Sequence, residues 1–421
     1  MNNPVKLILA NILVASLLLA LFDVIMFFVL PERYATAFPD YRTAPPPDAV
    51  GHGRYPKGYF VAHDQRGFDI GKNRSGNHWV SGVSYPIWSN SSGCFDHERA
   101  NTGDYVYFAG DSGTWGYAPF EQKFGTILEK ATGTPILKCG VPHTGQLHQF
   151  DKFSDLASQS GEMPRAIFVF HTSNDVANDY AYPHSTVIQG WLVDTVSLDG
   201  KNGLVRHAHE ELARKTQNKL DELQSIRKKE AQIPAWWRTS KSSIRYYSLT
   251  TNILLQIRHL SANQFTVQAE NGEDGASGRD DSALRQFYYL PQSRNGKYWY
   301  SDNPASDGNK RALLQFKNFS VKHDIELLII LMPPPDNPVD TDWFQEMREF
   351  LRENGIRHLD LSEKYRDRKL ARTDLAWAHD GHPSPPGNAI IADILMEEFP
   401  AVFGRRPSPA ETKSGDPAIS R

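Results

Sequence analysis

Residues 104–120, DYVYFAGDSGTWGYAPF, place a serine between a short apolar run and the start of a helical pattern. The apolar run YVYFA at 105–109 predicts a buried β-strand. The following stretch, FEQKFGTILEKATG at 120–133, puts Phe120, Phe124 and Leu128 at helical spacing. The sequence here therefore predicts a strand, a turn that contains Ser112, and a helix.

The same alternation of strand and helix continues along the chain. Further apolar runs predict strands at 134–140, 165–171, 324–331 and 356–362, and helical patterns occupy 146–160, 342–355 and 387–399. Strands that alternate with helices indicate an α/β fold whose parallel sheet is covered on both faces. Such sheets bind ligands at the carboxyl ends of their strands, so the residues that follow each strand are the candidates for function.

The alternation is interrupted at about 181–315, where we expect a large, mostly helical insertion. A highly charged stretch at 207–230 and a more apolar, aromatic one at 242–260 are its helix candidates. The insertion is predicted to form a cap beside the sheet, or else a packing appendage without a role in substrate binding. The polar stretch 268–282 predicts a mobile loop, and the aperiodic tail at 404–421 predicts disorder.

Residues 1–31 predict a membrane anchor. Between 7 and 30 the chain is apolar apart from three residues, one of them Asp23, and this length is enough for one helix to cross a bilayer. Lys6 on the short N-terminal side places the remainder outside the cytoplasm by the positive-inside rule. The alternative is a cleaved signal peptide that ends near residues 35–37. Asp23 is expected either at the outer interface or against a partner within the membrane.

Residues 32–100 are expected to be an extracytoplasmic spacer and lead-in to the main domain, which spans 101–403. Cys94 and Cys139 are the two cysteines of the chain, and an extracytoplasmic compartment would permit them to pair, but the sequence does not decide this. Lys and Arg number 46 against 49 Asp and Glu, so the charge balance gives no argument for a nucleic-acid partner.

Two predicted strand ends carry polar residues that suit acyl chemistry. Ser112 sits where a helix begins, and the backbone N–H groups there can hold a negative oxygen. Asn174 follows the strand at 165–171, and its amide could donate to the same oxygen. Taken singly, Ser112 could be a helix N-cap and Asn174 an Asx-turn or a cap. An α/β-hydrolase elbow is excluded because Thr114 replaces its second glycine.

Asp380 and His382 stand just before the last predicted helix. A serine hydroxyl needs a base, which a neutral imidazole provides, while a carboxylate on the other ring nitrogen fixes the tautomer. A trypsin-like protease is excluded because it would be all-β with its histidine well upstream of the serine. Metal binding by Asp380, His379 and His382 lacks a further ligand cluster, so neither a metal nor a cofactor is expected.

The residues GDSGTWG, CGVPHTG, TSND and DGHPSPPGN together resemble the SGNH (GDSL-type) hydrolases, across 104–180 and 324–400. The resemblance implies a flavodoxin-like three-layer α/β/α domain. It also implies Ser112 as nucleophile, His382 as base and Asp380 as its partner. The implied oxyanion hole consists of the Ser112 N–H, a backbone N–H of the second block and the Asn174 side chain.

Two positions depart from the family pattern. His143 stands in the second block where the family usually has glycine, so we expect an altered backbone or crowding there. Asp380 precedes His382 by two residues rather than three, and His379 occupies the three-back position. This shorter form is similar to that of some relatives active in polysaccharide acylation.

The sequence therefore predicts a membrane-anchored, extracytoplasmic serine esterase or O-acyltransferase that acts on acyl (acetyl) esters of a cell-surface polysaccharide. Its expected partners are the acylated glycan or another ester, the membrane through the N-terminal helix, and a membrane-bound acyltransferase. The alternative is a binding or assembly protein of an envelope glycan pathway that keeps this fold without the chemistry.

Overall fold

The computed structural model describes residues 4–30, 55–81, 83–99, 104–198, 203–232, 244, 247–254, 293–294, 297–377 and 380–403 of the chain. Its centre is a five-stranded parallel sheet with the order β15-β14-β7-β5-β6. When the five strands are numbered along the chain and read from the β6 edge, the order is 2-1-3-4-5, which is the flavodoxin-like arrangement. The strands are β5 (Val106–Gly110), β6 (Ile136–Lys138), β7 (Ala166–His171), β14 (Glu326–Leu331) and β15 (His358–Asp360).

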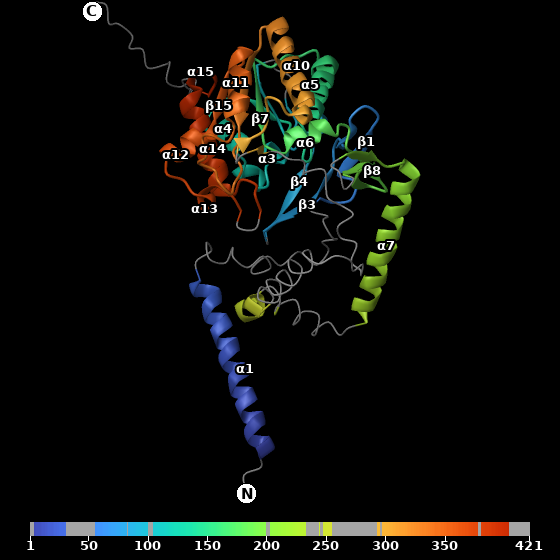
Figure 1. Ribbon diagram of the computed structural model, residues 1–421, viewed down its shortest axis with the longest axis vertical. Helices are drawn as coiled ribbons and strands as arrows, with labels where there is room; N and C mark the ends of the chain where they lie inside the picture. Colours follow the sequence, from blue (N-terminus) through green and yellow to red (C-terminus); the bar gives the residue numbers. More distant parts are fainter. Residues whose placement is uncertain are drawn as a thin grey trace, which may run out of the picture.

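Helices cover both faces of this sheet and give the three predicted layers (Figure 1). Each face buries its own apolar cluster, because the residues of a parallel strand point alternately to the two sides. One layer consists of α5 (Gln146–Ser160), α10 (Asp307–His323) and α11 (Gln345–Glu353). The other consists of α4 (Phe124–Thr132), α12 (Leu361–Asp367), α13 (Arg372–Leu375), α14 (Pro385–Glu398) and α15 (Pro400–Phe403).

The predicted lead-in contains two antiparallel hairpins ahead of the sheet. Their buried side chains join Trp115 and Tyr117 in a third apolar cluster, which lies beside the carboxyl end of β5. The hairpins are β1 (Phe60–His63) with β2 (Gly67–Ile70), and β3 (Ser75–Val80) with β4 (Val83–Trp88). Short single turns also lie near this edge: α3 (Ser112–Trp115), η1 (Phe120–Gln122), α6 (Asp175–Tyr180) and η4 (Pro304–Ser306).

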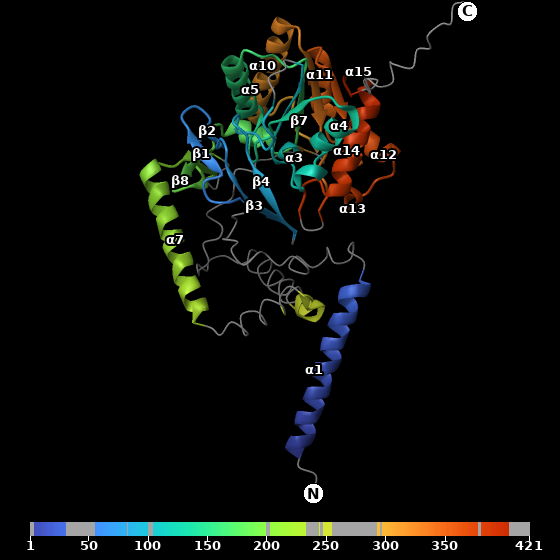
Figure 2. The same cartoon turned by 180° about the vertical axis from the view of Figure 1, so that it is seen from behind.

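The insertion begins with hairpins before its long helix. The hairpin of β8 and β9 contacts β1 and β2, whereas α7 extends away from the sheet (Figures 1 and 2). The elements are β8 (Ser185–Ile188), β9 (Trp191–Asp194), β10 (Val196–Leu198), β11 (Leu204–Arg206), α7 (His209–Ala231), β12 (Ser293–Arg294) and β13 (Lys297–Tyr298). The predicted mobile loop at 268–282 and the predicted disordered tail lie outside the described residues.

At the N-terminus, α1 (Pro4–Val29) is one helix, exposed over residues 8–22 and partly covered towards its C-terminal end. Its residues Ile8–Val29 are long and apolar enough to cross a membrane by length and composition. This fits a single-pass anchor, whereas the alternative cleavage site at 35–37 lies outside the described residues.

Candidate active site

Ser112 is the first residue of α3, directly beyond the carboxyl end of β5. Asp111, and not Ser112, is the N-cap, because its Oδ1 accepts the backbone N–H of Gly113 at 2.8 Å. The alternative interpretation of Ser112 as the capping residue is therefore wrong. The turn requires glycine at 110, where a Cβ would lie 1.9 Å from Oγ1 of Thr114. Within this turn the Ser112 hydroxyl has only a long contact, 3.3 Å, with Oδ2 of Asp111, and it makes a shorter contact elsewhere.

That contact is with His382, which stands 270 residues further along the chain. The Ser112 Oγ lies 2.8 Å from Nε2 of His382, and Nδ1 of the same ring is hydrogen-bonded to Oδ1 of Asp380. Asp380 is buried, and its Oδ1 also accepts the backbone N–H of His382 at 2.9 Å. When Nδ1 carries the proton toward Asp380, Nε2 is left as an acceptor for the serine proton.

A tight loop ahead of α14 holds the imidazole in this position. Ala376 and Pro383 form an isolated antiparallel bridge, and the Trp377 N–H donates to the carbonyl of His382 at 3.1 Å. Ser384 then caps α14 by accepting the N–H of Gly387 at 3.3 Å. His379 stands three residues before His382, where the family usually has its aspartate, and it lies outside the described residues.

Tyr117 packs flat on the face of His382. The two ring centroids lie 3.6 Å apart with an interplanar angle of 3°. The Tyr117 hydroxyl is hydrogen-bonded to the Tyr55 hydroxyl at 2.7 Å. The backbone carbonyl of Tyr117 accepts the indole N–H of Trp377. This stack fixes the plane of the imidazole. Sequence reasoning missed it, although Tyr117 lies within the stretch that first indicated the serine, because no local pattern predicts a contact across 265 residues.

Asn174 lies on the same side of the sheet and lines the same pocket as Ser112. It occupies the N-cap position of α6 but makes no capping bond with its side chain. Its Nδ2 donates instead to Oδ2 of Asp111 at 3.1 Å, and Thr172 donates to that oxygen at 3.0 Å. A primary amide has a second N–H, which remains for an oxyanion. Asp111 therefore orients Asn174 as well as capping α3.

His143 has the left-handed backbone that glycine would favour, with a φ of 68°. Its side chain does not line the pocket, and its Nε2 lies 2.8 Å from Oδ1 of Asp194 in the insertion. Burial alone would raise the pKa of Asp194, but the neighbouring His143 lowers it below the ordinary value. The His143 side chain thus ties the second-block loop to β9 rather than reaching the serine.

Buried polar side chains hold the start of α5 and the loop that follows β7. Asp179 accepts the N–H groups of Gln146 and Leu147 at 3.1 and 2.8 Å and so caps α5. Burial raises the pKa of Asp179 to about 7 and that of Asp175 well above its usual range, while it lowers the pKa of His171 to about 3. The interior beneath the site consequently favours neutral side chains.

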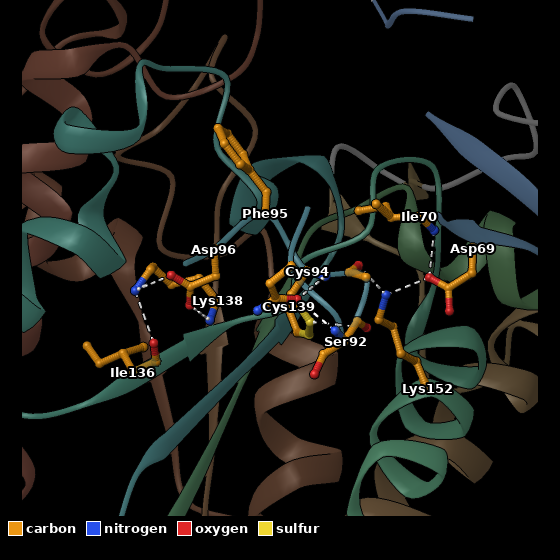
Figure 3. Close-up of a disulfide and its surroundings, with 12 residues drawn as sticks. Asp69, Ile70, Ser92, Cys94, Phe95, Asp96, Ile136, Lys138, Cys139 and Lys152 are labelled. Carbon is orange, nitrogen blue, oxygen red and sulfur yellow. Dashed lines mark hydrogen bonds and ion pairs between the residues drawn. A yellow bond between two sulfur atoms is a disulfide. The ribbon is translucent and has the colours of Figure 1, made fainter. Parts of the chain in front are cut away.

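Cys94 and Cys139 form a disulfide, which the sequence had left undecided (Figure 3). The bond joins the segment after β4 to the end of β6, one residue ahead of Gly140. Next to it, Lys138 Nζ lies 3.0 Å from a carboxylate oxygen of the buried Asp96. At Gly140 a Cβ would lie 2.2 Å from the backbone nitrogen of Trp115, so the second block runs directly against α3.

A pocket of about 240 Å³ opens at Ser112. One wall is apolar and built largely from prolines, which offer no backbone N–H. The residues of that wall are Met332, Pro333, Pro334, Pro335, Pro338, Leu375 and Ile391. Within the described ranges, no group of three or more His, Cys, Asp or Glu side chains is arranged to hold a metal ion.

No family model matches the sequence, and no curated protein matches it. Among solved structures, a putative lipolytic protein of the G-D-S-L family from Desulfitobacterium hafniense is 10% identical, with a TM-score of 0.34 over 70% of this chain and 99% of that one. A catalytic mutant of an acetylxylan esterase from Geobacillus stearothermophilus is 12% identical, with a TM-score of 0.32 over 73% and 98%. Scores of this size indicate only a distant likeness, and the chemistry of the site follows from its own residues.

Proposed function

We propose that this protein is a membrane-anchored serine esterase or O-acyltransferase of the SGNH type, with its catalytic domain outside the cytoplasm. The observation that carries the proposal is the continuous contact from the Ser112 hydroxyl through the His382 imidazole to the Asp380 carboxylate. A serine, a base and an orienting acid in this order are the parts that acyl transfer through a covalent intermediate requires.

In the first half of the reaction, Ser112 Oγ attacks the ester carbonyl while its proton passes to Nε2 of His382. Asp380 stabilises the imidazolium through Nδ1. The donors we assign to the tetrahedral oxyanion are the second N–H of Asn174, the backbone N–H of Ser112 and a backbone N–H of the second-block loop. The N–H of Gly113 is held by Asp111 and is not among them. The imidazolium then gives its proton to the departing alcohol oxygen, and the acyl group remains on Ser112.

In the second half, a water or an acceptor hydroxyl attacks the acyl-serine, and His382 takes and returns one proton in the same way. Water yields an acid and hence an esterase, whereas a sugar hydroxyl yields a new ester and hence a transferase. The same residues serve both outcomes, so the acceptor decides which activity the protein has.

The substrate class we propose is a short acyl ester, such as an acetyl ester, on a cell-surface polysaccharide. The modest volume of the pocket and its proline wall support a small acyl group. The apolar α1 and the disulfide support a location at the outer side of a membrane. A membrane-bound acyltransferase could supply the acyl group in a transfer reaction.

A fluorophosphonate probe tests the chemistry. The wild-type protein should be labelled covalently, and Ser112→Ala should not. Ser158→Ala, which removes an exposed serine of α5, serves as the matched control and should be labelled like the wild type. Absence of labelling in the folded wild type would overturn the catalytic proposal and favour the binding or assembly alternative.

A second assay separates the two activities. The protein is incubated with p-nitrophenyl acetate with and without an oligosaccharide acceptor, and the products are identified by mass spectrometry. Acetate alone in both incubations indicates an esterase, and an acetylated oligosaccharide indicates a transferase. Activity confined to lipid esters or thioesters would overturn the polysaccharide assignment.

A further inference from the structure

A second part of the chain, residues 247–254 of the insertion, packs against the end of α1 (Figure 1). Leu249 is 4% exposed and is surrounded by Met26, Phe27 and Leu30 of α1. The ring of Tyr247 meets that of Phe27 edge to face, with centroids 5.8 Å apart. Two segments separated by more than 200 residues therefore form one apolar contact.

Asp23 is the polar centre of this contact. Its Oδ2 accepts the hydroxyl of Ser248 at 2.6 Å, and its Oδ1 accepts both the backbone N–H and the hydroxyl of Thr250 at 2.9 Å. A carboxylate in a transmembrane helix is costly to bury, and such side chains pair with donors where they occur. The structure thus supplies the partner that the sequence left open as one of two alternatives for Asp23.

The depth of the contact matches that of a segment lying in the membrane interface. Asp23 precedes Leu30 by seven residues, a rise of about 10 Å along the helix. Amphipathic segments that lie in the interface bury their apolar side by about 5–10 Å. Residues 247–254 therefore lie beside the last two turns of α1, which would be at the outer interface if α1 spans the membrane.

Apolar side chains of this segment also face outward. Ile244 is 53% exposed, Tyr247 46% and Leu254 63%, next to an α1 whose Phe28 and Val29 are exposed as well. The sequence just before the segment, AWWRTSK at 235–241, combines tryptophans with cations. Aromatic and basic residues of this kind are typical of segments in the membrane interface. A lipid surface is the partner whose chemistry suits both α1 and this segment.

We propose that residues 247–254, with Ile244, form a second membrane contact, which inserts into the outer lipid interface beside α1 and is held there by Asp23. This inference rests on α1 as a membrane span, which is part of the proposed function. The 23 residues of α7, a length of about 35 Å, run from the hairpins of the insertion toward the level of this segment (Figure 2). The catalytic domain would then be tied to the bilayer at two points.

Site-specific fluorescence in liposomes tests this contact. The full-length protein, in vesicles of phosphatidylcholine and phosphatidylglycerol, carries a nitrobenzoxadiazole label on one introduced cysteine, since both native cysteines are paired. Leu254→Cys reports on the segment, Leu18→Cys on α1, and Val321→Cys, 73% exposed on α10, is the matched aqueous control. We expect blue-shifted emission and quenching by spin-labelled lipid at 254 and 18, and neither at 321.

The outcomes separate this inference from the anchor itself. A label at 254 that behaves like the one at 321, while 18 is quenched, overturns the second contact and leaves the anchor in place. A label at 18 that escapes quenching overturns both. In the Leu254→Cys background, Asp23→Ala should lower the quenching at 254 toward the value at 321, and Asp23→Asn, which keeps one acceptor oxygen, should restore part of it. Quenching unchanged by Asp23→Ala would overturn the role of the carboxylate.

Discussion

Replacement of Tyr117 by leucine should slow the chemical step without unfolding the site. The Tyr117 ring lies flat on His382 at 3.6 Å, and it is itself fixed by Tyr55 and by its place in the apolar cluster of the hairpins. When Ser112 gives up its proton, His382 becomes a cation against an aromatic face. That contact is attractive, so the ring favours the transition state over the ground state.

The burial of the ring pair sets the size of the effect. Cation–π contacts contribute about 0.5–1 kcal/mol at exposed sites and about 2 kcal/mol when desolvated. The His382 side chain is 24% exposed and Tyr117 is 5% exposed, which places this pair near the desolvated end. A loss of about 1–2 kcal/mol corresponds to a kcat/KM roughly 5- to 30-fold lower in Tyr117→Leu.

The assay is the hydrolysis of p-nitrophenyl acetate together with the rate of fluorophosphonate labelling, and thermal unfolding checks the fold. Tyr117→Phe is the matched control, because it keeps the ring and removes only the hydroxyl bonded to Tyr55. It should retain kcat/KM within about twofold while losing about 1–3 kcal/mol of stability. A folded Tyr117→Leu with wild-type kcat/KM would refute the reasoning, as would a Tyr117→Phe that loses as much activity as Tyr117→Leu.

Three further changes test other parts of the site. Asp380→Asn should lower kcat by about 10⁴-fold, because the amide no longer fixes the tautomer of the base; near-normal turnover of the ester would contradict the assigned partner. Asp194→Ala should lower the free energy of unfolding by about 1 kcal/mol, since it releases His143 from its bond. The added substitution His143→Gly should recover stability in urea titrations because glycine adopts the positive φ without strain; no recovery would contradict this role. Burial lowers the pKa of His148 to about 4, so its neutral form stabilises the fold above pH 6.5 and that stability is lost on acidification. Between pH 7 and pH 5 the wild type should lose about 2 kcal/mol more than His148→Gln; equal losses in urea titrations at the two pH values would contradict it.

The sheet and its main helices could be predicted from the sequence because their signals are local. Each strand is a short apolar run, and three of the five end in glycine or are followed within two residues by glycine or proline. The predicted strand at 105–109 differs from β5 (Val106–Gly110) by one residue at each end. The helices that follow have apolar residues at a helical period. Patterns of this kind depend on neighbours within one element and need no knowledge of the tertiary fold.

The hairpins of residues 60–88 could not be predicted, because their strands are four to six residues long and alternate weakly between buried and exposed positions. Their stability comes from distant partners, above all Trp115 and Tyr117. The stack of Tyr117 on His382 and the bond of His143 to Asp194 are of the same kind. Each joins segments whose proximity exists only after the chain has folded.

The loop between β6 and α5 is held from three sides, which explains how a non-glycine residue can occupy the left-handed position in it. The disulfide anchors its first residues at Cys139, the contact of Gly140 with Trp115 presses it against α3, and Asp194 holds the side chain of His143. A backbone in that region costs roughly 1–3 kcal/mol unless its surroundings impose it. The hairpin that carries Asp194 belongs to the insertion, so the insertion contributes to the geometry of the second-block loop even though His143 does not face the pocket. A loop fixed this firmly can present a backbone N–H to an oxyanion without reorganising during the reaction, which is the condition for electrostatic stabilisation of the transition state.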